Sequence, residues 1–444
     1  LPTKELSEDE RRWGPAADLV LTMAPDVGTS TNINPAMDEK TYGPEQENFE
    51  KKLGLGDKRR PDLVPHEEAW TRHIRFEIAE ANCMSAVGAF GKMRDHVGIS
   101  FLPIMTIYDF FIKRAYDQLY YNLYWKSGFV VVGTPSGTTL SPEGAQHSWK
   151  SDIQMPNVIT WEPFFAYEVD WILSETVRRH YLGDDANRSG VIIRAVTKAH
   201  RQNEMLKRLK TAKRFEGKSD EEIFAETRKD ALQGAYYLVD RRGFPDYVPG
   251  DNVVNLFAMG AMGWEALAAA DRLAADGIHA NVIVVTCGDL LAGNLGHEND
   301  FRHLREGLGI DGDLHLSRAG NGNGHGAVEA SERADLVTLA GRRVPLVTVV
   351  DGEPGLLDNL GSIVGVKSED LAVRKASKSG RPVDVYGYLH IDAHAIYDAA
   401  GKALADTALE TVRVPRDLLQ QLPASDAVSV GDAEARGELW PPRR

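Results

Sequence analysis

The amino-acid sequence predicts an α/β protein with two consecutive three-layer α/β domains and mostly parallel sheets. Short, almost continuous apolar runs such as "GFVVVG" and "NVIVVTC" alternate with segments whose apolar residues recur at helical spacing. A parallel strand is covered by helices on both faces, so its residues are apolar at successive positions. This alternation occurs twice, on either side of a charged stretch at 197–233, and therefore predicts two domains.

The first domain is expected over residues 1–200. A β-prone run within 17–32 ends in a loop of small polar residues, and the expected helix at 75–93 has small residues on one face, which suits close packing. The remaining expected elements are a strand at 97–105, an aromatic helix at 108–125, strands at 127–133 and 157–160, a helix at 163–180 and a strand at 190–196.

A charged helical linker or insert is expected over 201–244, and a solvated helical hairpin is the simplest interpretation of its charges. The second domain is expected over 245–444. Its expected elements are a strand, a Gly turn, an Ala-rich helix and a strand within 251–290, further strands in 342–354 and 382–392, and a closing helix at 393–404.

The composition is typical of a soluble enzyme that handles small molecules. The formal net charge is −14, from 51 Lys and Arg against 65 Asp and Glu, which disfavours nucleic acid as a partner. No apolar run approaches the roughly 18 residues of a membrane span, and the start has no signal-peptide pattern. Two isolated cysteines, Cys83 and Cys287, do not make a disulfide framework, so a cytoplasmic location is expected.

Several possible motifs have simpler explanations. "GNGNGHG" (320–326) lacks the Gly-Lys-Ser/Thr ending of a phosphate-binding loop, and "AMGAMG" (258–263) lacks the spacing of a dinucleotide-binding turn. His297 and His303 are six residues apart, which is weak spacing for metal ligands, and no metal site is predicted. No G-x-S-x-G elbow indicates a serine hydrolase.

A more informative group of residues lies in the first domain. Glu80 falls inside a helix of small residues, where a carboxylate is unfavourable unless it is paired or functional. Tyr108, Phe110 and Phe111 follow one apolar strand, and His147 ends the loop that follows the next strand. Ligands of α/β proteins bind at the carboxyl ends of the strands, so this arrangement predicts a site there.

Three segments resemble the thiamine-diphosphate enzymes of the transketolase and 2-oxo-acid dehydrogenase group. "GTPSGTTLSPEGAQHS" is similar to the Gly-Thr-Ser-Gly-Arg-Thr-Thr-Leu-x-x-Glu-Gly-Leu-Gln-His segment of the homodimeric-type pyruvate dehydrogenase decarboxylating component. "MPNVITWEPFFAYEVDWI" and "TIYDFFIKRAYDQL" resemble the stretches that follow and precede it in that family. The resemblance extends over most of 15–405 and implies a pyrimidine-binding domain at 1–200 and a transketolase-like C-terminal domain at 245–444.

The resemblance also implies roles for the candidate residues. Glu80 matches the carboxylate that hydrogen-bonds N1′ of the cofactor's aminopyrimidine, and Phe111 matches the aromatic residue that stacks on this ring, with Tyr108 and Phe110 beside it. His147 matches an active-site histidine that contacts substrate. Glu80 and His147 are thus the expected catalytic residues. The expected cofactor-binding residues are Glu80, Tyr108, Phe110 and Phe111.

The family binds Mg²⁺ and the diphosphate through Gly-Asp-Gly followed by Asn, and no Gly-Asp-Gly occurs in this sequence. The resemblance therefore implies that a partner subunit or an upstream domain holds most of the Mg²⁺ site. A symmetric heterotetramer is the expected assembly, with a lipoyl acyltransferase core as a further partner.

The expected activity is decarboxylation of a 2-oxo acid with transfer of the acyl group to a lipoyl acceptor. Two alternatives remain: a split transketolase-like two-carbon ketol transferase and a catalytically silent scaffold paralogue. Ala79 stands where transketolases have Arg, which disfavours the first alternative. The segment after His147 lacks the second histidine of the pyruvate enzymes, so the identity of the 2-oxo acid stays open.

Overall fold

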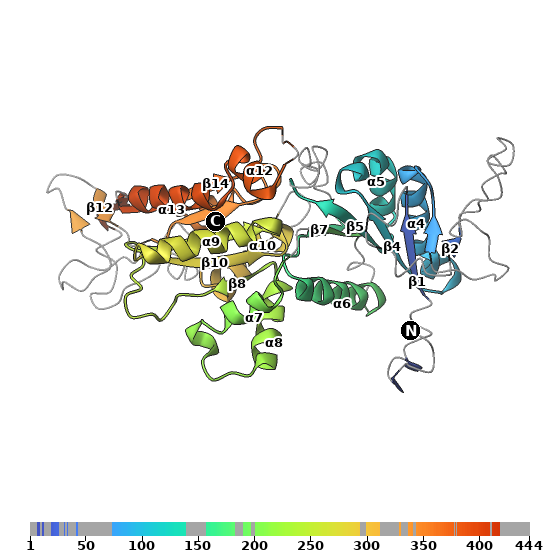
Figure 1. The fold of residues 1–444 in the computed structure, drawn as a ribbon, viewed down its shortest axis with the longest axis horizontal. Helices are drawn as coiled ribbons and strands as arrows, with labels where there is room; N and C mark the ends of the chain where they lie inside the picture. The colour runs from blue at the N-terminus through green and yellow to red at the C-terminus, as the bar shows by residue number, and fades with distance from the viewer. Residues whose placement is uncertain are drawn as a thin grey trace. The chain divides into compact units, whose positions relative to one another are not determined.

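The computed structural model describes residues 7–8, 11–12, 19–25, 31, 33, 41–42, 73–138, 157–182, 190–196, 200–293, 299–310, 328–329, 336–340, 343–376, 378, 380–408 and 411–417. The chain divides into two compact units (Figure 1). The first unit is Leu1–His200 with Thr286–Glu298 and Ala376–Gly380. The second is Arg201–Val285 with Asn299–Lys375 and Arg381–Arg444.

The described residues of the first unit form a seven-stranded parallel sheet with the order β2-β3-β1-β4-β5-β7-β6. Its strands are β1 (Val20–Ala24), β2 (Thr41–Tyr42), β3 (His73–Arg75), β4 (Leu102–Ile107), β5 (Phe129–Ser136), β6 (Val158–Trp161) and β7 (Gly190–Val196). The internal strands β4 and β7 are largely buried, as their continuous apolar sequences require. The parallel α/β fold predicted for this part of the chain is confirmed.

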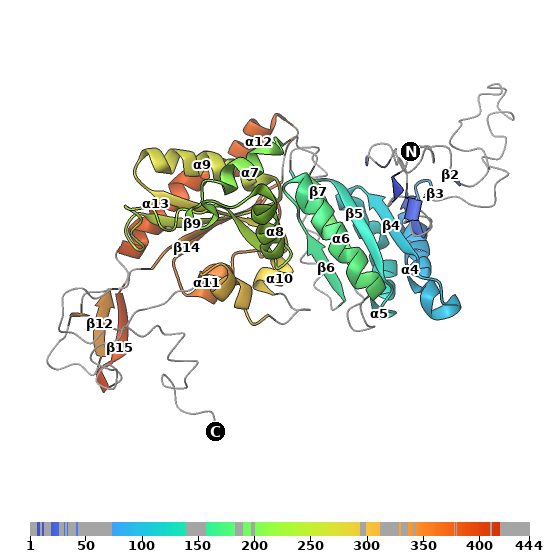
Figure 2. The ribbon, with the colours of Figure 1, turned by 90° about the horizontal axis from the view of Figure 1, so that it is seen from below.

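Helices cover both faces of this sheet. They are α4 (Glu80–Val97), the 3₁₀-helix η4 (Asp109–Ala115), α5 (Tyr116–Tyr124), α6 (Ala166–Leu182) and α10 (Gly288–Ala292). Figures 1 and 2 show α6 on the opposite side of the sheet from α5. The apolar core lies between α4, η4, α5 and the strands β1, β4 and β5. The predicted helix at 75–93 starts five residues late, because 73–75 pair with β1 as a strand.

Small residues let α4 approach its neighbours closely, as predicted. The Gly91 carbonyl accepts a hydrogen bond from the Gly128 N–H at 3.4 Å, and a Cβ at Gly91 would clash with the backbone of Gly128. A Cβ at Gly88 would likewise clash, with the side chain of Asn122, whose Nδ2 donates to the Met84 carbonyl at 2.7 Å. Backbone packed against backbone leaves no side chain that can move aside.

Gly91→Ala is expected to lower the free energy of unfolding by about 1–3 kcal/mol, the usual cost of overpacking a well-packed core. Urea denaturation measures the change. Gly401→Ala is the matched control, because no atom lies within 4 Å of a Cβ at this helical glycine. It should leave stability unchanged or raise it. Equal effects of the two substitutions would contradict the packing assigned to Gly91.

His73 on β3 is a buried neutral base. Its Nδ1 lies 2.8 Å from Thr22 Oγ1, and burial together with the charge of Arg75 lowers the pKa of His73 from 6.5 to about 4. The unfolded chain takes up this proton below pH 6.5, whereas the folded chain does so near pH 4. Its contribution to stability is therefore complete above pH 6.5 and is lost as the pH falls from 6.5 to about 4.

We expect the unfolding free energy of the wild-type chain to fall by up to about 3 kcal/mol across this window on account of His73. His73→Asn keeps a group that can hydrogen-bond Thr22 but does not titrate. Urea denaturation at pH 6.5 and at pH 4.5 should show a smaller pH dependence for His73→Asn than for wild type. An identical pH dependence in both proteins would contradict the neutral, buried state of His73.

The described residues of the second unit form a five-stranded sheet with the order β14-β13-β9-β10-β8, in which β8 runs antiparallel to β10 and the other pairs are parallel. Its strands are β8 (Ala235–Val239), β9 (Val253–Met259), β10 (His279–Val285), β13 (Leu346–Val349) and β14 (Ser368–Leu371). A separate antiparallel sheet contains β11 (Val328–Glu329), β12 (Leu336–Ala340) and β15 (Thr411–Pro415). Two α/β units with mostly parallel sheets thus match the predicted fold class.

The helices of the second unit are α7 (Asn203–Leu209), α8 (Asp220–Ala231), α9 (Gly263–Ala275), α11 (Leu360–Val364), α12 (Pro382–Leu389) and α13 (Ala393–Ala408), with short helices η8 (Lys213–Phe215), η9 (Gly260–Met262) and η10 (His303–Gly307). The strand predicted at 382–392 is wrong, because α12 forms there. Pro382 suits the first turn of a helix, where its missing N–H costs nothing. Val385, Tyr386 and Leu389 form its buried face.

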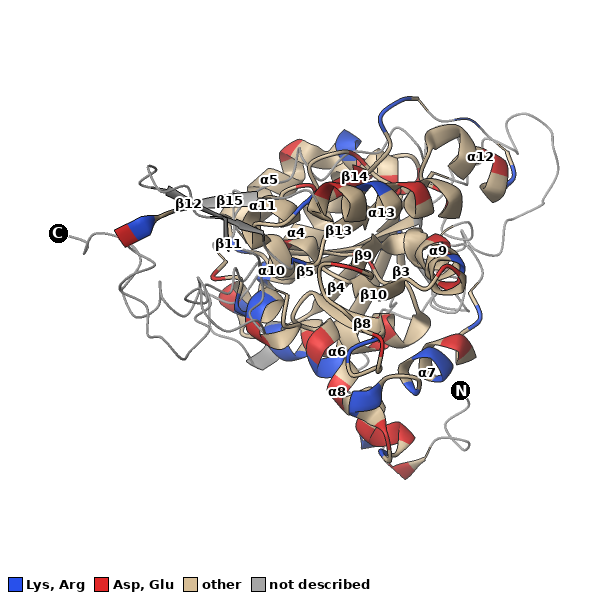
Figure 3. Ribbon diagram, turned by 90° about the vertical axis from the view of Figure 1, so that its left-hand side faces the viewer, with Lys and Arg blue, Asp and Glu red and all other residues tan. Residues whose placement is uncertain are grey.

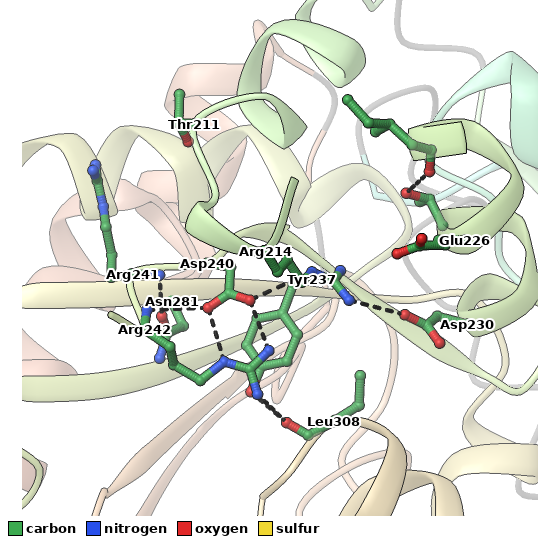
Figure 4. Close-up of polar contacts among 12 residues, drawn as sticks. Thr211, Arg214, Glu226, Asp230, Tyr237, Asp240, Arg241, Arg242, Asn281 and Leu308 are labelled. Atoms are coloured by element: carbon green, nitrogen blue, oxygen red, sulfur yellow. Dashed lines mark hydrogen bonds and ion pairs between the residues drawn. The ribbon is translucent and has the colours of Figure 1, made fainter. Parts of the chain in front are cut away.

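The charged segment of 201–244 forms α7, η8, α8 and the strand β8. Figure 3 shows charged residues of both signs along α7 and α8. Arg214 lies 3.4 Å from Asp230 and 3.5 Å from Asp240, and Asp240 also binds Arg242 at 2.7 Å (Figure 4). Arg242 and Tyr237 both donate to the Leu308 carbonyl, each at 2.9 Å. These contacts fix the helical segment to the sheet of the second unit.

Candidate functional site

Three of the predicted site residues lie together at the carboxyl end of β4. Tyr108 directly follows this strand, and η4 then carries Phe110 and Phe111. The ring of Phe111 lies 5.8 Å from that of Tyr108 and 5.9 Å from that of Phe110, centroid to centroid. The chain leaves the sheet at Tyr108 and Asp109, after the carboxyl end of β4. Ligands of parallel α/β proteins bind at this edge of the sheet, so the aromatic group lies where the sequence predicted a site.

Glu80 is connected to this aromatic group through Arg114. Glu80 is the first residue of α4, and its side chain is 7% exposed. Arg114 Nη1 donates to Glu80 Oε1 at 2.6 Å, and the Arg114 guanidinium carbon lies 3.8 Å from the centroid of the Phe111 ring. Glu80, Arg114 and Phe111 therefore form one continuous group of contacts.

The surroundings of Glu80 explain why a carboxylate is tolerated there. A helix N-terminus stabilises negative charge, and the Arg114 guanidinium adds a charge-assisted hydrogen bond. One helical turn further on, Cys83 is fully buried, and burial together with the charge of Glu80 raises the pKa of its thiol. The Cys83 thiol therefore stays protonated and unreactive.

A buried charge cluster supports the start of η4. The Arg194 guanidinium donates to Glu162 Oε1 at 2.7 Å and to Asp109 Oδ2 at 3.2 Å, and all three side chains are at most 5% exposed. Arg194 lies on β7, Glu162 directly follows β6, and Asp109 begins η4. The cluster ties the carboxyl ends of β6 and β7 to the turn that carries Phe111.

Gly133 on β5 makes room for this cluster. A Cβ at Gly133 would lie 2.8 Å from Asp109 Oδ1 and 3.3 Å from the Asp109 Cα. The lack of a side chain at Gly133, inside this strand, thus allows Asp109 to sit against the sheet. Asp109, Glu162 and Arg194 are not among the predicted site residues, although each lies at or within two residues of the end of an apolar strand.

His147 falls within residues 139–156, which lie outside the described residues. Its predicted contact with substrate therefore stays a prediction. Of the two histidines considered as weak metal ligands, His297 also lies outside the described residues, whereas His303 has its Nε2 2.8 Å from the Ala235 carbonyl oxygen.

Neither a metal cluster nor a membrane-spanning helix is found in the part of the chain that the structure describes. Among those residues, no three or more His, Cys, Asp or Glu side chains are grouped so that they could hold a metal ion. Likewise, no described helix is long and apolar enough to cross a membrane. Among the described residues of the site, Glu80 offers a buried acceptor and Phe111 a flat aromatic face.

Comparison with known sequences finds a similar domain over the part of the chain that contains Glu80 and Phe111. Residues 62–193 match the family model of the pyruvate dehydrogenase E1 component middle domain. The pyruvate dehydrogenase E1 component of Haemophilus influenzae is 47% identical over 91 residues, which are 18% of this chain and 10% of the relative. That of Cupriavidus necator is 28% identical over 159 residues, which are 32% of this chain and 18% of the relative. The matched segments thus span less than a fifth of the length of these relatives.

Comparison with solved structures shows the fold. The transketolase of Leishmania mexicana has a TM-score of 0.55 at 14% identity, covering 91% of this chain and 45% of that one. A transketolase variant of Pichia stipitis in complex with fructose 6-phosphate has a TM-score of 0.55 at 15% identity, covering 89% of this chain and 44% of that one. This chain spans less than half the length of these transketolases.

Proposed function

We propose that this chain, which carries a pyruvate dehydrogenase E1-type middle domain on a transketolase fold, binds thiamine diphosphate and takes part in decarboxylating a 2-oxo acid. The observation that carries the proposal is the buried Glu80 carboxylate linked to the Phe111 ring at the carboxyl edge of a parallel sheet. Glu80 and Phe111 both lie within the residues that match the middle domain.

The two groups suit the aminopyrimidine ring of thiamine diphosphate. A buried carboxylate can accept a hydrogen bond from a ring N–H, and an aromatic face can stack on a flat heterocycle. Glu80 would hold a proton at N1′, and Phe111 would orient the ring by its face. Bound thiamine diphosphate supplies the electron sink that carbon dioxide release requires.

Little water reaches the Glu80 side chain, which is 7% exposed. Cys83 and Met84, which follow it on α4, are fully buried. In a site with a low dielectric constant, the hydrogen bond between Glu80 and a ring nitrogen is stronger than it would be in water. His147 would contribute a hydrogen bond or a proton transfer at the substrate, as the resemblance implies.

The remaining parts of the active unit are proposed to come from elsewhere. A partner subunit or an upstream domain would bind the diphosphate and Mg²⁺, in a symmetric heterotetramer if the partner is a separate chain. A lipoyl acyltransferase would accept the acyl group, and the assembly would act in the cytoplasm. The chain spans less than half the length of the transketolases whose fold it shares.

Reconstitution tests the proposal. The chain is mixed with its pyrophosphate-binding half, thiamine diphosphate and Mg²⁺, and carbon dioxide release from 2-oxo acids is measured with a reducible dye as electron acceptor. Cofactor-dependent release is the expected result. Two-carbon transfer between sugar phosphates without carbon dioxide release would instead identify a ketol transferase, and inactivity in both assays would favour a silent paralogue.

A further inference from the structure

Arg114 makes the two contacts that the proposed function assigns to the cofactor ring. Its guanidinium carbon lies 3.8 Å from the centroid of the Phe111 ring, and its Nη1 donates to Glu80 Oε1 at 2.6 Å. The Arg114 side chain is 51% exposed, whereas that of Glu80 is 7% exposed. Arg114 thus reaches from the solvent-accessible end of η4 onto a buried acceptor and a flat aromatic face.

A guanidinium and an aminopyrimidinium present the same chemistry to these two residues. Both are flat, both carry positive charge, and both have N–H groups that lie in the plane of the group. The flat face stacks on an aromatic ring, and an N–H at the edge donates to a carboxylate. One Phe111 face and one Glu80 oxygen cannot serve both groups at the same time.

We infer that Arg114 competes with the aminopyrimidine ring for Phe111 and Glu80, so that it sets the affinity of the site for thiamine diphosphate. This inference rests on the proposed function. A ligand must offer a flat face and an in-plane N–H donor to replace the guanidinium, because Glu80 is too buried to be satisfied by water alone. Arg114 therefore also selects against flat ligands that lack such a donor.

The exposure of Arg114 makes the exchange feasible. Half of its side chain already faces solvent, so the guanidinium regains most of its hydration when it turns away from Glu80. The ring then takes over the hydrogen bond to the carboxylate, and Glu80 stays paired throughout. Only molecules in which Arg114 has left Phe111 and Glu80 can bind the ring. The apparent Kd is therefore the intrinsic Kd divided by the fraction of such molecules.

The opposite role predicts the opposite result. If Arg114 were a permanent brace for Glu80, its removal would leave the carboxylate badly placed and would weaken ligand binding. If Arg114 competes, its removal strengthens binding. Since the two roles differ in sign, a binding titration separates them.

The test is calorimetric titration of thiamine diphosphate, with Mg²⁺ present, into the chain reconstituted with its pyrophosphate-binding half. Arg114→Gln is expected to lower Kd roughly tenfold, because it removes the flat cation that must be displaced. Arg94→Gln is the matched control, since it makes the same charge change at an exposed position of α4 and should leave Kd unchanged. Arg114→Lys should give a smaller gain than Arg114→Gln, because an ammonium pairs with Glu80 but lacks the planar fork.

An unchanged or higher Kd for Arg114→Gln, with wild type binding normally, would overturn this inference and leave the proposed function standing. Absence of binding to wild type and to Arg114→Gln alike would overturn both. A double-mutant cycle of Arg114→Gln and Glu80→Gln gives a second measurement, read by urea denaturation. Coupling between the two residues is expected without thiamine diphosphate and should vanish at saturating thiamine diphosphate; coupling that persists in both conditions would overturn the competition.

Discussion

Glu80→Gln is expected to lower the rate of carbon dioxide release by roughly 10²–10⁴-fold, the range typical of losing a positioned proton-transfer group. Gln has the shape of Glu and can still accept a hydrogen bond from Arg114, but it cannot carry the charge that holds a proton at N1′. The loss should therefore appear in turnover, with little change in the urea midpoint. Steady-state turnover of the reconstituted assembly measures it.

Glu77→Gln is the matched control for this prediction. Glu77 lies three residues before Glu80, and its side chain is 48% exposed, so the same charge is removed outside the site. Glu77→Gln should keep turnover close to wild type. If Glu80→Gln kept more than half of the wild-type rate, Glu80 would not be the group that acts on the cofactor ring.

The second large effect concerns stability. Arg194→Met is expected to lower the free energy of unfolding by about 3–5 kcal/mol, because it removes the cation shared by two buried carboxylates. The Asp109 and Glu162 side chains are 1% and 5% exposed, so water cannot replace the guanidinium without opening the structure. Urea denaturation monitored by circular dichroism measures the loss.

Arg178→Met provides the comparison. Arg178 pairs with Glu175 on the exposed face of α6, where its side chain is 59% exposed, and an exposed pair contributes little to stability. Its substitution should leave the urea midpoint near that of wild type. A loss for Arg194→Met no larger than that for Arg178→Met would contradict the supporting role of the buried cluster.

Much of the fold is predictable from the periodicity of the sequence. Continuous apolar runs predicted buried parallel strands, and β4, β5, β7, β9 and β10 have this character. Segments whose pattern is short or mixed were harder to assign. Residues 382–392 alternate in a way that suits a strand, yet packing of Val385 and Leu389 makes a helix there. The antiparallel direction of β8 depends on pairing with β10, which local sequence does not encode.

The site was predictable where chemistry is unusual for its surroundings. A carboxylate in a helix of small residues predicted that Glu80 would be paired or functional, and the structure pairs it with Arg114. Its partner could not be predicted, because 34 residues separate the two in the chain. The same holds for Arg194, which lies 85 residues from Asp109. Contacts between distant strand ends follow from the order of strands in the sheet, which depends on pairing between segments far apart in the chain.

The role of the cofactor site is tested most directly by a structure of the chain with its pyrophosphate-binding half and thiamine diphosphate. We expect the aminopyrimidine ring to stack on Phe111 with N1′ within hydrogen-bond distance of Glu80 Oε1, and the Arg114 side chain to have turned away. A structure in which the Arg114–Glu80 ion pair persists while thiamine diphosphate binds elsewhere would contradict the account.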